Sequence, residues 1–357
     1  LPQAQALSGA DRAALVAAAD GVRAAALAHQ RWINETLVPA ARGDFRIGGA
    51  NFDAKLAVAL SSSLSRADIK SRARAAVEQP RAEMADIAAR VLGRSAPRDP
   101  QAAIAAALEK AYAERPARAN VVGFARQTLD ESTQFVRSRD LITLPDAPVD
   151  IIIMPEFQRG VAVAYCDSPG PLDKGQKTFY AISPIPDDWT DAQTTSFLRE
   201  YNNRSIHELT IHEAMPGHYV QLWHANRYKS VLRAAFYSGT FVEGWACYAQ
   251  DMMGEEGYYG NDLLGGLINR KWRLRLITNA MLDSAIHVDG MTREEAMTLM
   301  TQTAFQEERE AAGKWVRAQV SSTQLSTYFV GWVEHYALRD RARKAWGDGF
   351  SLKRYHD

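Results

Sequence analysis

The segment Ile206-His-Glu-Leu-Thr-Ile-His-Glu-Ala-Met-Pro-Gly-His-Tyr-Val-Gln221 contains three of the eight histidines of the chain. In the metal-binding pattern HExxH, two histidines four residues apart share one face of a helix, and the glutamate after the first reaches a metal-bound water. His212 and Glu213 supply the first half of this pattern, but Pro216 stands where the second histidine belongs. On an unbroken helix, His218 would lie roughly 120° around the axis from His212. A regular helix therefore does not bring the two imidazoles together.

Pro216 and Gly217 predict a break at this point of the helix. Proline removes a helical hydrogen bond and disfavours the helical conformation in the residue before it, and glycine adopts backbone conformations closed to other residues. We therefore interpret His212–His218 as HExxH with a two-residue bulge, in which the kink turns His218 back toward His212. Two alternatives stay open. In the first, His207 or His224 is the second ligand, although both fit packing or surface positions better. In the second, the cluster is a set of ordinary helix histidines.

A metal held by two histidines needs a further protein ligand, which is commonly a carboxylate from a following helix. The run Phe241-Val-Glu-Gly-Trp-Ala-Cys-Tyr-Ala-Gln250 provides Glu243 among apolar and aromatic neighbours. A carboxylate buried there without a partner would be costly, and a metal would supply the partner. The alternative is a buried ion pair between Glu243 and an arginine such as Arg204 or Arg273.

The pairing of His212–His218 with the Glu-Gly-Trp-Ala run at 243–246 resembles the bacterial family called domain of unknown function 885, which is similar to zinc peptidases of the gluzincin type. The resemblance covers roughly residues 145–339 and includes Gly290–Ala296 and Tyr328–Gly331. It implies one zinc ion per chain.

The resemblance also implies a role for each residue of the site. His212, His218 and Glu243 would hold the zinc, and Glu213 would act as the general base. Tyr328 would stabilise the oxyanion, by similarity to the tyrosine of helical gluzincins. Otherwise Tyr328 is a core aromatic residue with a satisfied hydroxyl.

One further catalytic candidate follows from helical spacing. Asp283 and His287 lie four residues apart within an expected helix over residues 271–287, so their side chains face the same way. We expect His287 to donate a hydrogen bond to the developing oxyanion or to a substrate carbonyl. The alternative is an Asp–His pair that locks two helices together.

The rest of the chain predicts a mainly α fold. Residues 8–140 are rich in Ala, Arg, Glu and Leu, which favours packed helices. Beyond Pro145, β-branched and aromatic runs predict a small sheet of about three strands, at 149–153, 161–165 and 178–182. A cap at Thr190 predicts a long helix that continues to Ala214. The resemblance implies a large helical domain with a deep cleft and one small β-sheet beside the active-site helix, similar to neurolysin and angiotensin-converting enzyme. We expect an N-terminal helical part at 1–144 and a catalytic part at 145–357, joined in one continuous compact domain.

Composition excludes several classes of protein and partner. The 357 residues carry 42 Lys+Arg against 42 Asp+Glu, and this zero net charge disfavours nucleic-acid binding. No apolar run is long enough to span a membrane, and no nucleotide-binding glycine motif or GxSxG elbow occurs. Cys166 and Cys247 lack CxxC spacing, so a thiolate metal site is not indicated, and a single disulfide between them stays open.

The opening residues Leu1–Ala6 have the small and polar composition of a mature secreted N-terminus. We therefore expect removal of a signal peptide and a periplasmic or secreted protein, with a cytoplasmic location as the alternative. The site predicts a zinc-dependent hydrolase that cleaves amide bonds of short peptides, its partner being a short peptide or small amide substrate. Two alternatives stay open: a metal-dependent amidase or esterase on a small non-peptide substrate, and a metal-free helical binding protein. The oligomeric state, the side-chain preference and the direction of cleavage are not indicated.

Overall fold

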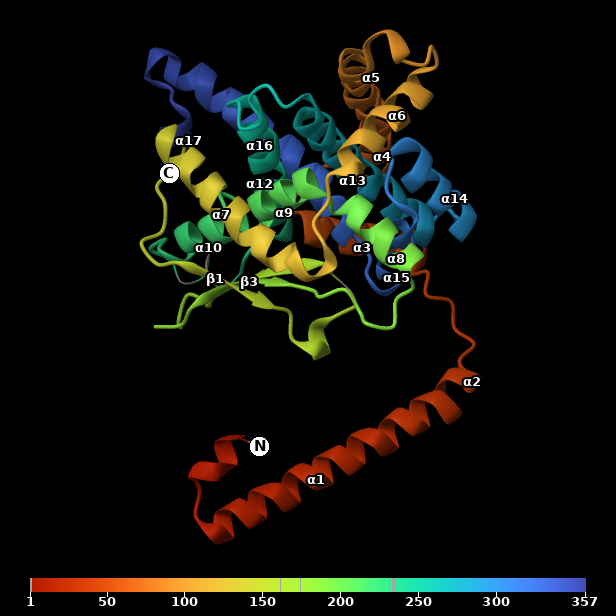
Figure 1. The fold of residues 1–357 in the computed structure, drawn as a ribbon, viewed down its shortest axis with the longest axis vertical. Coiled ribbons are helices and arrows are strands. Elements are labelled where there is room, and N and C mark those ends of the chain that lie inside the picture. The colour runs from red at the N-terminus through yellow and green to blue at the C-terminus, as the bar shows by residue number, and fades with distance from the viewer. Residues whose placement is uncertain (1, 161, 174, 231, 233–235) are drawn as a thin grey trace. The chain divides into compact units, whose positions relative to one another are not determined.

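The computed structural model describes residues 2–160, 162–173, 175–230, 232 and 236–357. The chain divides into two compact units, Leu1–Phe45 and Arg46–Asp357, and the second unit runs through residue 145 without a break. The first unit consists of a 3-10 turn at Pro2–Ala6, α1 (Gly9–Trp32), a π-helical segment at Ile33–Leu37 and α2 (Val38–Ala40) (Figure 1). Ser8 caps α1, and none of the residues of this helix is buried.

The second unit begins with helices that form its first core. They are α3 (Gly48–Leu60), α4 (Arg66–Ala76), α5 (Glu78–Leu92) and α6 (Pro100–Ala113). Ser65 and Asp68 form a reciprocal capping box at the start of α4, and Asp99 caps α6 just before Pro100. The buried faces of these helices carry Phe52, Met84 and Ile104, each at most 1% exposed. The helices predicted from the Ala-rich composition are confirmed.

A second core surrounds the small sheet. Helix α7 (Val121–Ser138) leads into the strands β1 (Val149–Ile153), β2 (Ala164–Asp167) and β3 (Thr178–Ile182), which lie in the order β1-β3-β2. β1 runs parallel to β3, and β2 runs antiparallel to it, with Ala164 opposite Ile182. The small sheet predicted from the sequence is confirmed, with the first and third strands at the expected residues. The second strand begins at Ala164, and residue 161 of its predicted range lies outside the described residues.

The long helix predicted from Thr190 to Ala214 is wrong, because the chain forms two helices there. Thr190 does cap a helix, α8 (Asp191–Glu200), in a capping box with Gln193. The chain then turns, and α9 (Asn203–Glu213) begins behind Asn202. The side chain of Asn202 accepts from the backbone N–H groups of the first turn of α9 and donates to Arg199 O at 2.9 Å. Asn202 thus ends one helix and starts the next.

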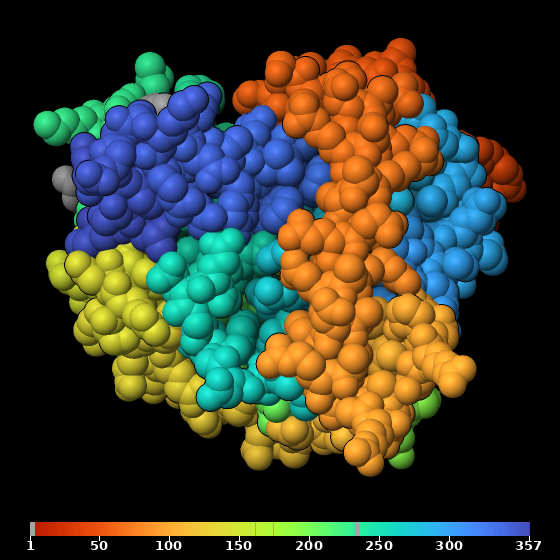
Figure 2. All heavy atoms as spheres, turned by 90° about the horizontal axis from the view of Figure 1, so that it is seen from above, coloured from red at the N-terminus to blue at the C-terminus, as the bar shows by residue number. Residues whose placement is uncertain are grey.

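The remaining helices form the centre of the second unit and reach both of its sides, with α10 and α17 at the left and α14 at the right of Figure 1. They are α10 (His218–Asn226), α12 (Gly239–Glu255), α13 (Leu263–His287), α14 (Arg293–Thr298), α15 (Glu308–Val320), α16 (Gln324–Trp346) and α17 (Leu352–His356), with a π-helical segment at Leu299–Thr303 between α14 and α15. Figure 2 shows the orange surface of α3 to α6 crossing this unit beside the teal surface of the α12–α13 region. Residues of α13 and α16 contribute to the first core, and residues of α9 and α12 to the second. The candidate site described below lies among these four helices.

Helices α12 and α16 cross at two glycines with their backbones in direct contact. A Cβ atom on Gly244 would lie 2.3 Å from the carbonyl carbon of Gly331, and one on Gly331 would lie 2.0 Å from Thr240 O. No side chain fits between the two helices at this point. The crossing brings Glu243 on α12 close to the helix that carries Tyr328.

The mainly helical fold class is confirmed, and the cleft of the neurolysin type stays a prediction. In the described part of the chain, none of the helices combines the length and the apolar character that a membrane crossing requires. Cys166 and Cys247 are both free thiols, so the disulfide between them is not formed.

Candidate functional site

The HExxPGH segment forms two helices joined by a tight loop, which corrects the predicted bulge within one helix. Helix α9 ends at Glu213, Ala214 leaves the helical conformation, and α10 begins at His218. The N–H of Gly217 donates to Ile211 O at 2.9 Å. A Cβ on Gly217 would lie 1.9 Å from the carbonyl oxygen of His212, so only glycine fits there. The loop is therefore folded back onto the last turn of α9, and this fold-back carries His218 to His212.

The three predicted metal ligands converge in the structure. His212 Nε2 and His218 Nε2 each lie 3.5 Å from Glu243 Oε2, and the three side chains are 10%, 12% and 19% exposed, respectively. The donor atoms all lie within 4.8 Å of one another. The loop is tied to the helix of the third ligand, because Trp245 Nε1 donates to Pro216 O at 2.9 Å. The ends of two helices and the first turn of α12 thus meet at one point.

The chemistry of this cluster fits a metal ion. Two imidazole nitrogens and one carboxylate oxygen form a common donor set for zinc. Glu243 Oε2 is buried and has no hydrogen-bond partner among the described residues. A buried carboxylate oxygen without a partner is unfavourable, and a cation at the focus of the three donors would remove that cost.

A chain of hydrogen bonds orients His212 from behind. His212 Nδ1 lies 3.1 Å from Gln250 Oε1, and Gln250 Nε2 donates to Glu208 Oε2 at 2.9 Å. Because the amide oxygen only accepts, Nδ1 donates to it, and Nε2 is the ring nitrogen that faces the cluster. Glu208 also accepts from Asn269 Nδ2 at 2.9 Å and from the Tyr259 hydroxyl. Sequence reasoning missed Glu208 and Gln250, although Glu208 lies one helical turn before His212 and so shares its face.

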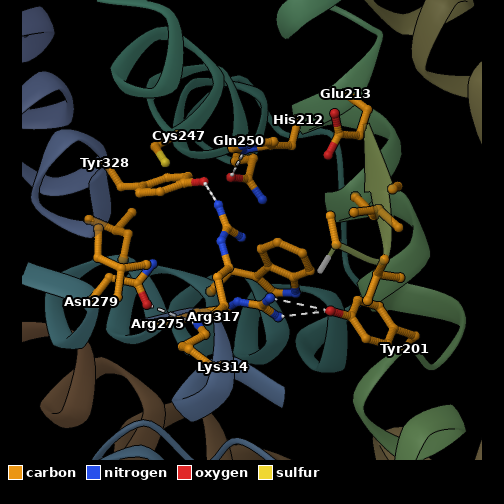
Figure 3. A pocket seen from close by; sticks show the side chains of 17 residues that line it. Tyr201, His212, Glu213, Cys247, Gln250, Arg275, Asn279, Lys314, Arg317 and Tyr328 are labelled. Carbon is orange, nitrogen blue, oxygen red and sulfur yellow. Dashed lines mark hydrogen bonds between the residues drawn. The ribbon is translucent and has the colours of Figure 1, made fainter. Parts of the chain in front are cut away.

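Glu213 lies beside the cluster in a cavity of about 90 Å³ (Figure 3). Burial raises the pKa of Glu213 to about 7; the positive charge of His212 opposes this rise and the negative charge of Glu243 adds to it. A carboxyl group with a pKa near the working pH is suited to take up and return a proton.

Tyr328 lines the same cavity, and its ring stacks on that of His212 with the centroids 6.2 Å apart. Its hydroxyl oxygen accepts from Arg317 Nη2 and from Gln324 Nε2, each at 3.0 Å. Gln324 Nε2 also lies 3.2 Å from Glu243 Oε1. Since both N–H groups donate to the phenolic oxygen, the hydroxyl hydrogen of Tyr328 is left to donate elsewhere.

His287 lies against the chain between α15 and α16, and its predicted catalytic role stays a prediction. The residues that line the cavity do not include it. Its Nε2 atom lies 2.8 Å from Ala318 O and 2.7 Å from Ser321 O, so it holds the chain between α15 and α16. Asp283 holds the same segment by accepting from Ser326 N at 2.8 Å. Helical spacing predicts that Asp283 and His287 share a face. In the structure this face packs against the turn between α15 and α16.

The other candidate ligands, and the arginines considered as partners of Glu243, contact different groups in the structure. His207 Nδ1 lies 2.8 Å from the Tyr258 hydroxyl, and His224 Nε2 lies 2.8 Å from Thr143 O. Arg204 pairs with Asp262 at 2.7 Å, and Arg273 pairs with Asp251 at 2.9 Å. None of these four side chains joins the cluster of His212, His218 and Glu243 that the described residues form.

Sequence reasoning also missed the basic residues of the cavity. Arg275 on α13 and Lys314 and Arg317 on α15 line it together with Asn279. Figure 3 shows Arg317 directed toward Tyr328, Lys314 toward Asn279 and Arg275 toward Tyr201. The spacing of Lys314 and Arg317 places them on one face of α15. That signal was present in the sequence, but nothing in it showed that this face meets the cavity.

The fold and the site together define a helical protein with a small sheet and a buried cluster of two histidines and a glutamate. The chain belongs to the family DUF885, described as bacterial protein of unknown function, which matches residues 2–357. The resemblance to this family stated from the sequence is confirmed, and the gluzincin activity stays a prediction.

Two solved structures are similar to the chain. The first, from Shewanella oneidensis, is described as a "putative lipoprotein of unknown function"; it is 34% identical with a TM-score of 0.79, and the match covers 98% of this chain and 64% of that chain. The second, described as a "putative lipoprotein" from Colwellia psychrerythraea, is 22% identical with a TM-score of 0.82, and the match covers 98% of this chain and 60% of that chain. The chain thus spans less than two thirds of the length of either structure. The comparison with curated proteins gives no match.

Proposed function

We propose that the chain is a zinc-dependent hydrolase that cleaves amide bonds of short peptides. The observation that carries the proposal is the convergence of His212, His218 and Glu243, with Glu213 next to His212 in a cavity that these two residues line. Two histidines and a carboxylate leave one position of a tetrahedral zinc site open, which is the arrangement of catalytic and not of structural sites. The hydrogen-bond chain behind His212 supports the same assignment, because metal-binding histidines are held in this way.

The residues of the cavity have distinct parts in the proposed reaction. Zinc would supply a Lewis acid that polarises the scissile carbonyl and activates a water. Glu213 takes a proton from the attacking water and then gives it to the leaving amine. Tyr328 donates its hydroxyl hydrogen to the developing oxyanion, while Arg317 and Gln324 hold its oxygen in place.

The sheet supports a peptide as the substrate. β2 is an edge strand of the sheet, and residues 162–164 at its start line the cavity beside Glu213. The unpaired edge of a strand binds extended peptides through backbone hydrogen bonds. A panel of peptide, amide and ester substrates separates the peptidase from an amidase or esterase that uses the same metal chemistry.

A location outside the cytoplasm, in the periplasm or secreted, belongs to this proposal. It is supported by the description of the Shewanella oneidensis structure as a "putative lipoprotein".

Metal content tests the proposed zinc site. We expect mass spectrometry to find about one zinc per chain in the wild type, as a two-histidine, one-carboxylate site requires. Glu243→Ala and His218→Ala lose the zinc, because each removes one ligand. His224→Ala is the matched control, since His224 lies on the same helix as His218 but bonds to Thr143 O. This control keeps the zinc.

The chemical step is tested with Glu213→Gln, which removes the base and no proposed ligand. This variant keeps its zinc and loses peptide hydrolysis by roughly a hundredfold or more. A wild type that takes up no zinc would overturn the proposal. So would a zinc-loaded Glu213→Gln variant with full activity.

A further inference from the structure

Two basic side chains, the buried Lys314 and the half-buried Arg317, face the cavity beside the candidate metal cluster (Figure 3). Lys314 is only 5% exposed, and its Nζ donates to Asn279 Oδ1 at 2.9 Å. Arg317 Nη2 donates to Gln324 Oε1 at 3.1 Å and to the Tyr328 hydroxyl at 3.0 Å. All of these acceptors are neutral groups. These bonds satisfy the two donor groups but supply no negative charge to them.

Of the acidic residues nearby, Glu243 belongs to the metal cluster and its charge acts on Arg317 from there, and two others are engaged by other cations. Glu310 pairs with Arg275 at 2.5 Å. Glu200 pairs with Lys271 at 2.6 Å and lies 3.6 Å from Arg275. No ion pair found among the described residues includes Lys314 or Arg317. A cation buried without a counter-ion is strongly unfavourable, so this part of the protein favours an anionic ligand.

The pKa of Lys314 agrees with this excess of positive charge. Burial is the largest cause that lowers it well below its ordinary value, and the charges of Arg275 and Arg317 lower it further. The charge of Glu310 acts in the opposite direction and does not cancel them. An anion bound between Lys314 and Arg317 would restore the charged ammonium.

The position of the two cations connects them to the reaction centre. Both line the cavity of Glu213, and both also line a second cavity of about 160 Å³, so they lie where the two cavities meet. Arg317 bonds to Tyr328, whose ring stacks on His212. The guanidinium of Arg317 is therefore hydrogen-bonded directly to the phenol that stacks on a member of the metal cluster. Consecutive Cα atoms lie about 3.8 Å apart, so a carboxylate on the residue after the cleaved bond is a substrate anion that stays close to the reaction centre.

We propose that Lys314 and Arg317 bind a substrate carboxylate, namely the C-terminal carboxylate of a short peptide, so that the enzyme releases the C-terminal residue. This inference rests on the proposed hydrolase function. In the reaction the C–N bond of the last peptide link breaks, the acyl carbon gains the hydroxyl of water, and the amine of the released residue gains the proton. An acidic side chain on the last residue offers the same chemical group, and the experiment below separates the two sources.

Binding of three matched peptides to zinc-free and zinc-loaded Glu213→Gln protein tests the proposal by calorimetry. The first peptide ends in a free carboxylate, the second has the same sequence with a C-terminal amide, and the third is an amide whose last residue is glutamate. We expect the free acid to bind at least about tenfold more tightly than the plain amide, as a charge-assisted hydrogen bond is lost in the amide.

Variants assign that preference to the two cations. Lys314→Met, made in the same Glu213→Gln background, abolishes the preference for the free acid, and Arg317→Gln reduces it. Lys344→Met is the matched control, because Lys344 is an exposed lysine on α16, and it keeps the preference. Equal binding of the free acid and the plain amide, or a preference that survives in both Lys314→Met and Arg317→Gln, would overturn the proposal. So would a preference for the glutamate amide over the free acid.

The failure of this inference is distinguishable from the failure of the proposed function. Peptide binding requires neither zinc nor turnover. If the wild type takes up no zinc and the protein still prefers the free acid, the carboxylate site is kept and the hydrolase function is ruled out. A zinc-loaded wild type that cleaves amidated peptides as fast as free acids keeps the hydrolase and removes the carboxylate site.

Discussion

Glu208 is the most deeply placed acid of the hydrogen-bond chain that orients His212. Three side chains donate to it, those of Gln250, Asn269 and Tyr259, and it is fully buried. Burial raises the pKa of Glu208 to about 7, despite the hydrogen bonds that lower it. The carboxyl group that fixes the histidine is thus itself close to titration near neutral pH.

This raised pKa predicts a pH dependence of stability. Between the ordinary value of 4.5 and the folded value of about 7, the folded protein holds a proton on Glu208 that the unfolded chain has released. The stabilisation that this proton provides is fully present below pH 4.5. It is lost as the pH rises through 7, which lowers the free energy of unfolding by roughly 3 kcal/mol. Glu213, whose pKa is also raised to about 7, adds to the fall over the same range. We therefore expect Glu208→Gln to make the fall smaller by the share of Glu208, measured by urea unfolding of metal-free protein between pH 4.5 and 7.5.

Exposed Glu308 on α15 gives the matched control, and Glu308→Gln keeps the wild-type slope. Equal slopes for the wild type and Glu208→Gln would show that Glu208 does not titrate in this range.

At the residue scale, the sequence reveals groups that follow a spacing rule and misses groups that act through contacts between helices. His212, Glu213 and Glu243 could be named because a metal motif fixes their order along the chain. Gln250 and Lys314 could not, since their roles arise only where α12 and α15 meet other elements. The contacts of His287 with Ala318 O and Ser321 O were missed for the same reason, because a shared helix face does not reveal its neighbour.

At the scale of elements, the loop between α9 and α10 decides the site. Pro216 and Gly217 signal a break, but helical periodicity describes only continuous helices and does not give the form of that break. The break between α8 and α9 was missed because the helical pattern of the sequence continues through it. A single polar residue, Asn202, ends α8 and caps α9. The strands at 149–153 and 178–182 were predicted at the right residues because proline, glycine or aspartate bounds each run.

Gly217→Ala tests the loop. The new Cβ would lie 1.9 Å from His212 O, so the loop or the last turn of α9 has to shift. We expect the free energy of unfolding to fall by about 2 kcal/mol or more and zinc affinity to fall with it. Urea denaturation and a zinc titration measure the two effects.

Gly123→Ala is the control for this substitution, because a Cβ on this α7 residue meets nothing within 4 Å. It leaves stability unchanged or raises it by about 0.5 kcal/mol through helix propensity. A Gly217→Ala protein as stable as Gly123→Ala, with unaltered zinc affinity, would contradict the assignment of the loop.

At the scale of the whole molecule, composition predicts the helical class but not the division after Phe45. Residues 1–45 share the Ala-rich composition of the helices that follow, so the sequence shows no change at that point. What distinguishes them is burial, since α1 has no buried residue and both apolar cores draw on residues from Phe52 onward. This difference depends on tertiary packing, which periodicity does not record.

Removal of residues 1–45 tests the independence of the second unit. We expect residues 46–357 to unfold in one cooperative transition, at a urea midpoint close to that of the full chain, when followed by circular dichroism. The reason is that neither apolar core loses a side chain.

Removal of residues 350–357 is the comparison. It takes away His356, whose Nε2 lies 2.9 Å from the Tyr248 hydroxyl, and Tyr355, which packs on the second core. This shorter deletion lowers the midpoint. An unfolded or aggregated 46–357 protein would show that the first unit is required for the fold of the second.

The contact between Gly244 and Gly331 has a consequence for the dynamics of the cavity. With the backbones of α12 and α16 touching, Glu243 and Tyr328 lie on one rigid pair of helices and do not separate when a ligand enters. Tyr328 lines the cavity, and so do residues 162–164 at the start of β2, which belong to neither of these helices. We therefore expect opening of the cavity during ligand exchange to take place on the strand side, while the arrangement of Glu243 and Tyr328 stays constant.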